Sequence, residues 1–175
     1  MTEKRLRCVV DTNVATTANC ANPGAPSTCV AESARALQRV MATGHVFLDN
    51  GGLIVAEYRG NLNPKGQPGP GDMYLKWILT HEWGDEKVTR VEITEKPNDP
   101  EDFEELPTPP SGVVYDRSDR KFLAVAAAHP EKPVILQSFD SKWWGWRTAL
   151  AKANIKVVFL CESEIAKKHK EKMRE

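Results

Sequence analysis

The sequence predicts an α/β protein: a three-layer α/β/α sandwich around a central, mostly parallel sheet. Short apolar, β-branched runs alternate along the chain with stretches of helical periodicity, and this alternation favours a parallel sheet covered on both faces. The length of 175 residues suits one domain, 1–175. With 41% hydrophobic and 27% charged residues, the composition is typical of a globular protein with a packed core and excludes a disordered or fibrous one.

The first predicted elements are a strand and an amphipathic helix. Leu6 to Val10 is a short apolar run, typical of a buried strand, and an acidic residue follows it directly. After a loop, apolar residues recur at helical spacing over 30–41, with Ser27 or Thr28 as the N-cap and Gly44 just beyond the end. The first strand therefore delivers a carboxylate to the loop at its C-terminal end.

A second strand and helix follow. Val46 to Leu48 predicts a short strand, and Asn50 can cap a helix over 53–58. Glu57 lies on or beside the apolar face of that helix. The segment from Asn61 to Gly71 is rich in proline and glycine, which predicts a loop.

The middle of the chain combines regular elements with an acidic insertion. Helical spacing resumes over 74–79, and alternation over 88–93 predicts a strand. From Glu95 to Glu105 six acids accompany one lysine, and prolines bound the segment on its C-terminal side. This insertion, about 95–110, is expected to be mobile and to contribute nothing to the core.

The last part of the chain is regular again. A helix is predicted over 122–127, a strand over 134–136, another helix over 143–153 and a last strand over 157–160. The charged tail, about 162–175, mixes acids with its basic residues, which favours a solvated helix end over a nucleic-acid patch.

Charge and cysteine content limit the class of protein. Lys and Arg number 24, as do Asp and Glu, so any nucleic-acid partner must be held by a local patch rather than a global positive field. No run of about 18 apolar residues predicts a membrane span, and the cytoplasm is the expected location. The four cysteines lack the spacing of a metal site, so a zinc site is not expected. The cysteines are expected to be reduced thiols.

Candidate chemistry comes from acids at the ends of predicted elements. Asp11 follows the first strand, Asp140 follows a later strand, and Asp119 lies in the first turn of a helix, so these carboxylates can meet at one sheet edge, joined by Glu57. Four carboxylates without a balancing Lys or Arg would repel each other and need bound cations. Oxygen ligands suit Mg²⁺ or Mn²⁺, as one or two ions that support phosphodiester hydrolysis. Each acid alone is typical of a helix cap or a solvated side chain.

Four motifs that contain these acids resemble a known family. They are Val-Val-Asp-Thr-Asn-Val at 9–14, Leu-Ile-Val-Ala-Glu-Tyr at 53–58, Asp-Arg-Lys-Phe-Leu-Ala-Val-Ala at 119–126 and Ser-Phe-Asp at 138–140. In this order they resemble the acidic motifs of PIN-domain nucleases, from about Arg7 to Leu160. The first and third motifs are the specific ones.

The resemblance implies a PIN-like sandwich that cleaves single-stranded RNA or structured nucleic acid with divalent metal. It implies that four acids bind the metal and serve catalysis, and that three neighbouring residues support them. The metal-binding acids are Asp11, Glu57, Asp119 and Asp140, and the supporting residues are Asn13 and Ser138, which would orient the acids or a water, with Thr12 of the same opening motif. The chain departs from many members where Lys142 replaces an acid, and in the length of its 95–110 insertion. Lys142 can lower the negative charge of the site or contact a phosphate.

Several neighbouring residues have competing interpretations. Asp116 and Asp119 can face the same way around a helix start, and the apolar continuation favours Asp119 as ligand and Asp116 or Ser118 as cap. Nearby tryptophans fit a helix face packed on the sheet, which leaves Trp144 as the candidate for stacking on unpaired bases. Together with Lys142, Arg120 completes the set of candidate nucleic-acid contacts.

The function expected from these features is metal-dependent endonucleolytic cleavage of single-stranded RNA. The resemblance to PIN-domain nucleases further implies a toxin or defence ribonuclease with an inhibitory or regulatory protein partner. A homo-oligomer is compatible with the sequence, and a membrane partner is not expected. One alternative is a non-catalytic module of the same fold that binds a protein. Another is a metal-dependent phosphohydrolase for a small phosphate ester, which would have a closed pocket instead of a basic, elongated groove.

Overall fold

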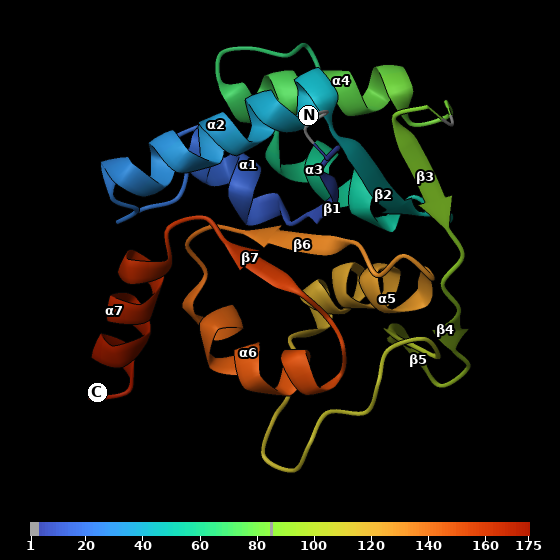
Figure 1. Ribbon diagram of the computed structural model, residues 1–175, viewed down its shortest axis with the longest axis vertical. Helices are drawn as coiled ribbons and strands as arrows, with labels where there is room; N and C mark the ends of the chain where they lie inside the picture. The colour runs from blue at the N-terminus through green and yellow to red at the C-terminus, as the bar shows by residue number, and fades with distance from the viewer. Residues whose placement is uncertain (1–3, 85) are drawn as a thin grey trace.

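The computed structural model describes residues 4–84 and 86–175 and has a five-stranded parallel sheet at its centre (Figure 1). The strand order is β3-β2-β1-β6-β7, and every neighbouring pair in it is parallel. A separate antiparallel pair, β4 with β5, lies outside this sheet. The strands are β1 (Arg7–Val10), β2 (His45–Asp49), β3 (Val88–Val91), β4 (Glu95–Lys96), β5 (Asp99–Phe103), β6 (Val134–Gln137) and β7 (Val157–Phe159).

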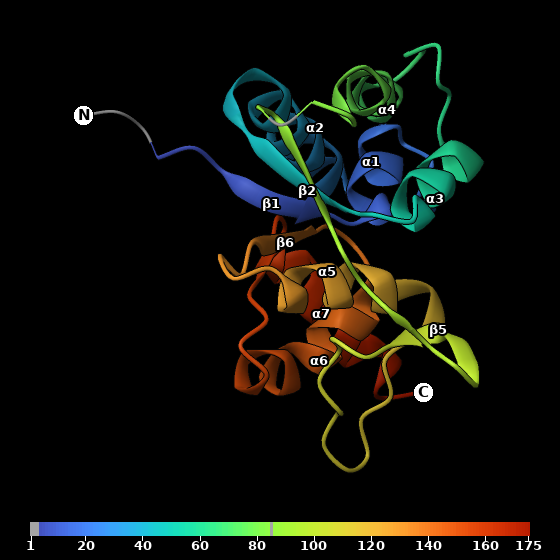
Figure 2. The same cartoon turned by 90° about the vertical axis from the view of Figure 1, so that its right-hand side faces the viewer.

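Helices cover both faces of the sheet (Figures 1 and 2). Helices α1, α2 and α4 pack together on one face, α5, α6 and α7 lie on the other, and α3 contacts β2, α1 and α5. Their bounds are α1 (Thr12–Ala18), α2 (Ser27–Thr43), α3 (Leu53–Asn61), α4 (Pro70–His81), α5 (Arg120–Ala128), α6 (Ser141–Lys152) and α7 (Glu162–Lys172), with a 3₁₀ turn η1 (Arg117–Asp119) before α5. The α/β class is confirmed, and the arrangement is compatible with the predicted three-layer sandwich.

The order of the strands reverses at β1. From β1 the chain adds β2 and β3 on one side, and later adds β6 and β7 on the other. Because the strands are parallel, the C-terminal ends of β1 and β6 meet at the same edge, where open α/β sheets bind their ligands. The backbone N–H of Asp11 donates to the carbonyl of Leu136 at 3.2 Å, which fixes these two strand ends side by side.

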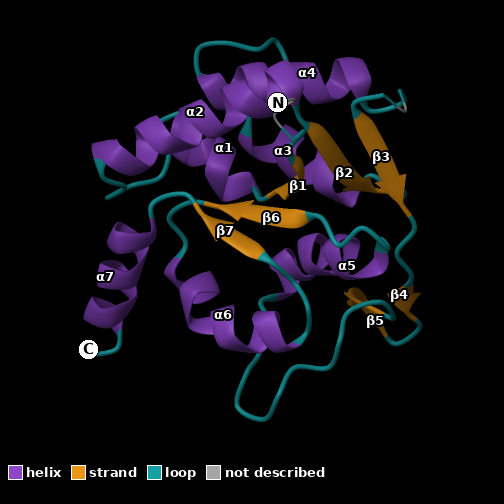
Figure 3. Cartoon of the chain, in the orientation of Figure 1, coloured by secondary structure: helices purple, strands orange, loops and turns teal. Residues whose placement is uncertain are grey.

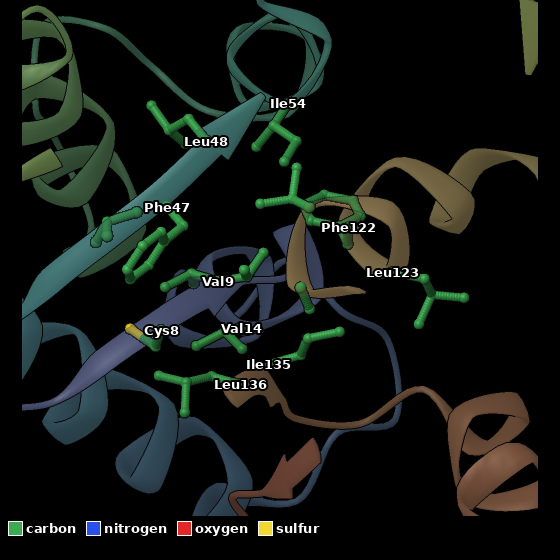
Figure 4. Packing of buried hydrophobic residues seen from close by; sticks show 14 of the residues in the cluster. Cys8, Val9, Val14, Phe47, Leu48, Ile54, Phe122, Leu123, Ile135 and Leu136 are labelled. Carbon is green, nitrogen blue, oxygen red and sulfur yellow. The ribbon is translucent and has the colours of Figure 1, made fainter. Parts of the chain in front are cut away.

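The core explains why the predicted strands form where they do. Short apolar runs without polar alternation can be buried on both faces, as in parallel sheets. Cys8, Val9 and Val10 of β1 are fully buried, and residues from α1, β2, α3, α5 and β6 surround them. Figure 4 shows this packing, in which Phe47 of β2 and Phe122 of α5 contribute to the same core from separate parts of the chain.

Two predicted helix caps are wrong. Helix α2 begins at Ser27 itself, with Pro26 at the N-cap position. For α3, the cap role expected of Asn50 belongs to Asp49, whose two carboxylate oxygens each accept a 2.8 Å hydrogen bond, from the backbone N–H groups of Leu53 and Ile54. Asp49 is fully buried at the end of β2, so its charge is satisfied by the helix start instead of by solvent. A short helix, α1, also occupies part of the segment expected to be a loop.

The acidic segment forms a β-hairpin (Figure 3), and the expectation that it contributes nothing to the core is wrong. Its anionic side chains find partners that a single sequence does not reveal: Lys96 pairs with Asp102 at 2.8 Å, and Arg117 pairs with Asp99 at 2.7 Å. Phe103, only 2% exposed, anchors β5 in the main core. These contacts order a segment that composition alone marks as disordered.

The expectation of reduced thiols is wrong for two of the cysteines. Cys29 of α2 and Cys161, which precedes α7, form a disulfide with a Cα–Cα distance of 5.3 Å across 132 positions of sequence. Cys8 and Cys20 are thiols. The disulfide ties α2 to the start of α7, and this pairing depends on long-range packing that cysteine spacing does not encode. Within the described ranges, no helix is both long and apolar enough for a membrane span.

Candidate functional site

Asp11 stands at the centre of the C-terminal sheet edge. It follows β1, caps α1, and is only 4% exposed. Its Oδ2 atom accepts hydrogen bonds from the backbone N–H of Asn13 and from the side-chain amide of Gln137, each at 3.0 Å. Burial raises the pKa of Asp11 well above its ordinary value, and the nearby charges of Asp119 and Glu57 raise it further, against the lowering effect of the two hydrogen bonds. Both hydrogen bonds use Oδ2, so Oδ1 is the atom that can accept a further ligand.

Asp119 approaches the same edge from the other layer. It closes η1 at the start of α5 and is 6% exposed. Burial raises its pKa to about 6, and the charges of Asp140 and Asp116 add to the rise, while Lys142 opposes it. The Nζ atom of Lys142 lies 2.9 Å from Asp119 Oδ2, yet this buried oxygen accepts no hydrogen bond of good geometry from the described residues.

Lys142 gathers the remaining carboxylates. Its Nζ atom lies 3.3 Å from Asp140 Oδ2 and also pairs with Asp116. Burial alone would lower the pKa of Lys142, but the hydrogen bond to Asp116 and the negative charges of Asp119 and Asp140 outweigh it and raise the pKa. Lys142, in the first turn of α6, is therefore a cation surrounded by three carboxylates.

Glu57 has a lysine partner of its own. Its side chain, on α3, is 25% exposed and pairs with the ammonium group of Lys121 on α5. The expectation of four acids without balancing cations is therefore wrong: Lys121 and Lys142 both lie among them. Glu57 is nevertheless close enough to raise the pKa of Asp11, so α3 and β1 bring these two carboxylates to the same region.

Whether these acids suit a divalent metal depends on donor chemistry and on placement. The chemistry suits Mg²⁺ or Mn²⁺, because the donors are carboxylate oxygens and a buried oxygen of Asp119 lacks a well-formed hydrogen bond. The placement does not suit a metal: among residues 4–84 and 86–175, no three acid, His or Cys side chains are grouped to hold a metal ion. The ammonium group of Lys142 lies between Asp119 and Asp140 instead. A metal at Asp119 and Asp140 would have to displace the ammonium of Lys142.

The predicted supporting residues divide into those that touch the acids and those that do not. Asn13 orients Asp11 through its backbone N–H, while its side-chain oxygen accepts a 2.6 Å hydrogen bond from the backbone of Phe139. Thr12 is 5% exposed, and its hydroxyl has no hydrogen-bond partner in the described part of the chain. Ser138 does not orient the acids: its hydroxyl lies 2.7 Å from that of Ser33 on α2.

The remaining candidates lie around the rim. Asp116 does not cap η1 with its side chain, and pairs with Lys142 instead. Arg120 donates to the carbonyl of Tyr115 at 3.0 Å and lies 3.8 Å from Asp99, so it braces the hairpin. Trp144 is half-buried, with its edge against Phe159 and the guanidinium of Arg147 over its ring. By contrast, the neighbouring tryptophans of α6 are buried in the core, as predicted.

Sequence reasoning missed two residues that contact the acids directly. Gln137 is the last residue of β6 and donates to Asp11, and its place at the end of a predicted strand was a usable signal. Lys121 stands two positions after Asp119 within the third acidic motif, but its pairing with Glu57 depends on the packing of α3 against α5.

Comparisons with protein-family models, with curated proteins and with solved structures give no match to this chain. The site is therefore interpreted from its own geometry.

Proposed function

We propose that this protein is a divalent-metal-dependent nuclease that hydrolyses phosphodiester bonds, with single-stranded RNA as its substrate. The observation that carries the proposal is the meeting of carboxylates from four separate segments at the edge where the strand order reverses. Asp11 and Asp119 are buried there; burial raises the pKa of Asp11, and the nearby charge of Asp119 raises it further. Buried carboxylates with raised pKa values in a ligand-binding position are typical of functional sites rather than of structural ones.

In the proposed reaction, water adds to phosphorus as the bond to the leaving oxygen breaks, and a proton passes from the water to solvent or to the leaving group. A bound Mg²⁺ or Mn²⁺ would supply activation of the water and charge neutralisation at the phosphate. Asp11, Glu57, Asp119 and Asp140 are the residues that would hold the metal. Gln137 and the backbone of Asn13 keep Asp11 in one orientation through their hydrogen bonds.

Lys142 has a second role in this proposal. Its ammonium group balances Asp119 and Asp140 before metal binds. With a metal ion bound by these carboxylates, the side chain of Lys142 would have the length and charge to contact a substrate phosphate at the rim. Trp144, two residues further along α6, offers part of its ring for stacking on an unpaired base.

The test is a digest of labelled single-stranded RNA, single-stranded DNA and duplex controls with Mg²⁺, with Mn²⁺ and with chelator. Metal-dependent cleavage of single-stranded RNA is expected, and Asp11→Asn should abolish it because the variant removes one ligand charge while keeping the side-chain shape. Asp116→Asn is the matched control, since Asp116 also pairs with Lys142 but lies outside the quartet. Equal cleavage by Asp11→Asn and the parent chain at saturating Mg²⁺ would refute the assignment.

A second candidate is a non-catalytic binding module, and the lysine partners favour it. Lys121 and Lys142 already neutralise much of the acidic cluster, as expected of a scaffold that no longer needs metal. This alternative predicts that neither Mg²⁺ nor Mn²⁺ raises the melting temperature. The nuclease predicts a rise, because a cation that binds only the folded state stabilises it by mass action.

A further inference from the structure

A basic concavity lies at the opposite edge of the sheet from the acids. Its volume is about 680 Å³, and it is formed where β1, β6 and β7 begin. Of the described residues that line it, one is acidic, Glu131, and six are basic. The basic residues are Lys4, Arg5, Arg7, Arg39, Lys132 and Lys156.

The parallel sheet is what brings these residues together. Cys8 pairs with Val134 and Ile135 pairs with Val157, so the residues just before these strands lie next to one another at one edge. The backbone N–H of Ile135 donates to the carbonyl of Lys156 at 2.8 Å, which holds Lys156 beside β6. Chain segments more than a hundred positions apart thus contribute to one surface.

Part of the positive charge of the concavity is offset within the described lining. Arg7 pairs with Glu131, the one acid in the lining. Arg5 donates to the backbone carbonyls of Gly44 and Glu86, contacts that hold the guanidinium in place without removing its charge. The whole chain has a formal net charge of zero, but its charges are distributed unevenly. The concavity is basic while the opposite edge of the sheet carries the acids, so a polyanion is attracted to the concavity.

We propose that this concavity binds the phosphate backbone of a single-stranded nucleic acid. A pocket for one small anion would hold it with buried, converging polar groups. Here none of the six basic side chains is buried: Lys4, Arg5, Arg39 and Lys156 are exposed, and Arg7 and Lys132 are half-exposed. Cations spread over an exposed surface suit successive phosphates along a strand. No aromatic side chain belongs to the described lining, so binding here is independent of base sequence.

The experiment measures binding without cleavage, so it does not depend on the proposed nuclease activity. The full chain in chelator is titrated into a fluorescent single-stranded RNA and, in parallel, a single-stranded DNA of the same length, over a range of salt. The variant is Lys4→Glu combined with Lys156→Glu. The matched control is Lys65→Glu combined with Lys76→Glu, which makes the same change of net charge at exposed positions beside a different hollow, near α4.

The concavity variant should bind RNA and DNA at least about tenfold more weakly at low salt. Its salt dependence should fall by about 1.4 units of log–log slope, because two phosphate contacts to a single strand are lost. The control should stay within about twofold of the parent chain. Equal losses in both variants would overturn the proposal, since they would show an effect of net charge alone. Binding of inorganic tripolyphosphate, measured by calorimetry, without measurable binding of either oligonucleotide would also overturn it, in favour of a small polyanion. If the chain binds the oligonucleotides at the concavity but cleaves none of them with metal, the binding site is supported and the proposed nuclease activity is refuted.

Discussion

Replacing Asp119 by Asn should stabilise the metal-free protein at neutral and alkaline pH. Asp119 is only 6% exposed, and burial is the chief cause that raises its pKa from an ordinary 3.8 to about 6. The unfolded chain therefore binds fewer protons at this position than the folded chain between these two pH values. Stability from this group is present below about pH 4 and is lost as pH rises through about 6. Asparagine keeps the shape of the side chain and has no charge to bury.

The size of the effect follows from the two pKa values. A difference of about two units corresponds to about 3 kcal/mol of unfolding free energy at pH 8. That value already includes the favourable effect of Lys142, which keeps Asp140 and Asp116 as partners in the variant. Removal of the Asp119 charge also lowers the pKa of Asp11, and this adds to the stabilisation of the variant at neutral and alkaline pH. At about pH 4 parent and variant should have nearly equal stability.

Urea unfolding in chelator, followed between pH 4 and 8 without reductant, measures this difference. At pH 8 the midpoint for Asp119→Asn should lie about 1 to 2 M above that of the parent chain. Asp116→Asn serves as the control, because Asp116 contacts the same lysine with a side chain that is 57% exposed, and its midpoint should change little. A pH-independent difference, or a variant less stable than the parent at pH 8, would refute the view that burial of this charge opposes folding.

Three other outcomes follow from the same structure. Lys142→Gln should lower the melting temperature in chelator and increase the stabilisation by Mn²⁺, because no ammonium then competes for the carboxylates; an unchanged Mn²⁺ effect in thermal melts would show that Lys142 does not compete. Glu101→Gln combined with Glu104→Gln, two exposed acids of the hairpin next to η1, should tighten binding of a single-stranded oligonucleotide at low salt and not at high salt, and equal affinities at low salt would exclude a restraining role. Cys161→Ala should destabilise the protein by about 2 to 5 kcal/mol, and a melting temperature equal to that of the non-reduced parent would contradict a disulfide that constrains the unfolded chain.

The predictable part of this protein is what neighbouring residues decide. Apolar runs such as the one before Asp11 alternate with stretches of helical spacing, and this alternation made a parallel sheet the expected arrangement. The strand order places Asp11 and Asp140 at one edge of that sheet. Periodicity reports which side of an element is buried, and a residue just after a parallel strand necessarily lies at the C-terminal edge. The position of the acids could therefore be inferred before any contact was known.

The tertiary structure alone decided which charges meet. Lys142 pairs with Asp119 and Lys121 with Glu57 only because helices from separate parts of the chain pack at one edge. The same holds for the disulfide, whose cysteines are 132 positions apart, and for the hairpin acids paired with Arg117. The local sequence pattern does not predict such partners, because the free energy of an ion pair or a disulfide depends on distance in space and not on distance in sequence.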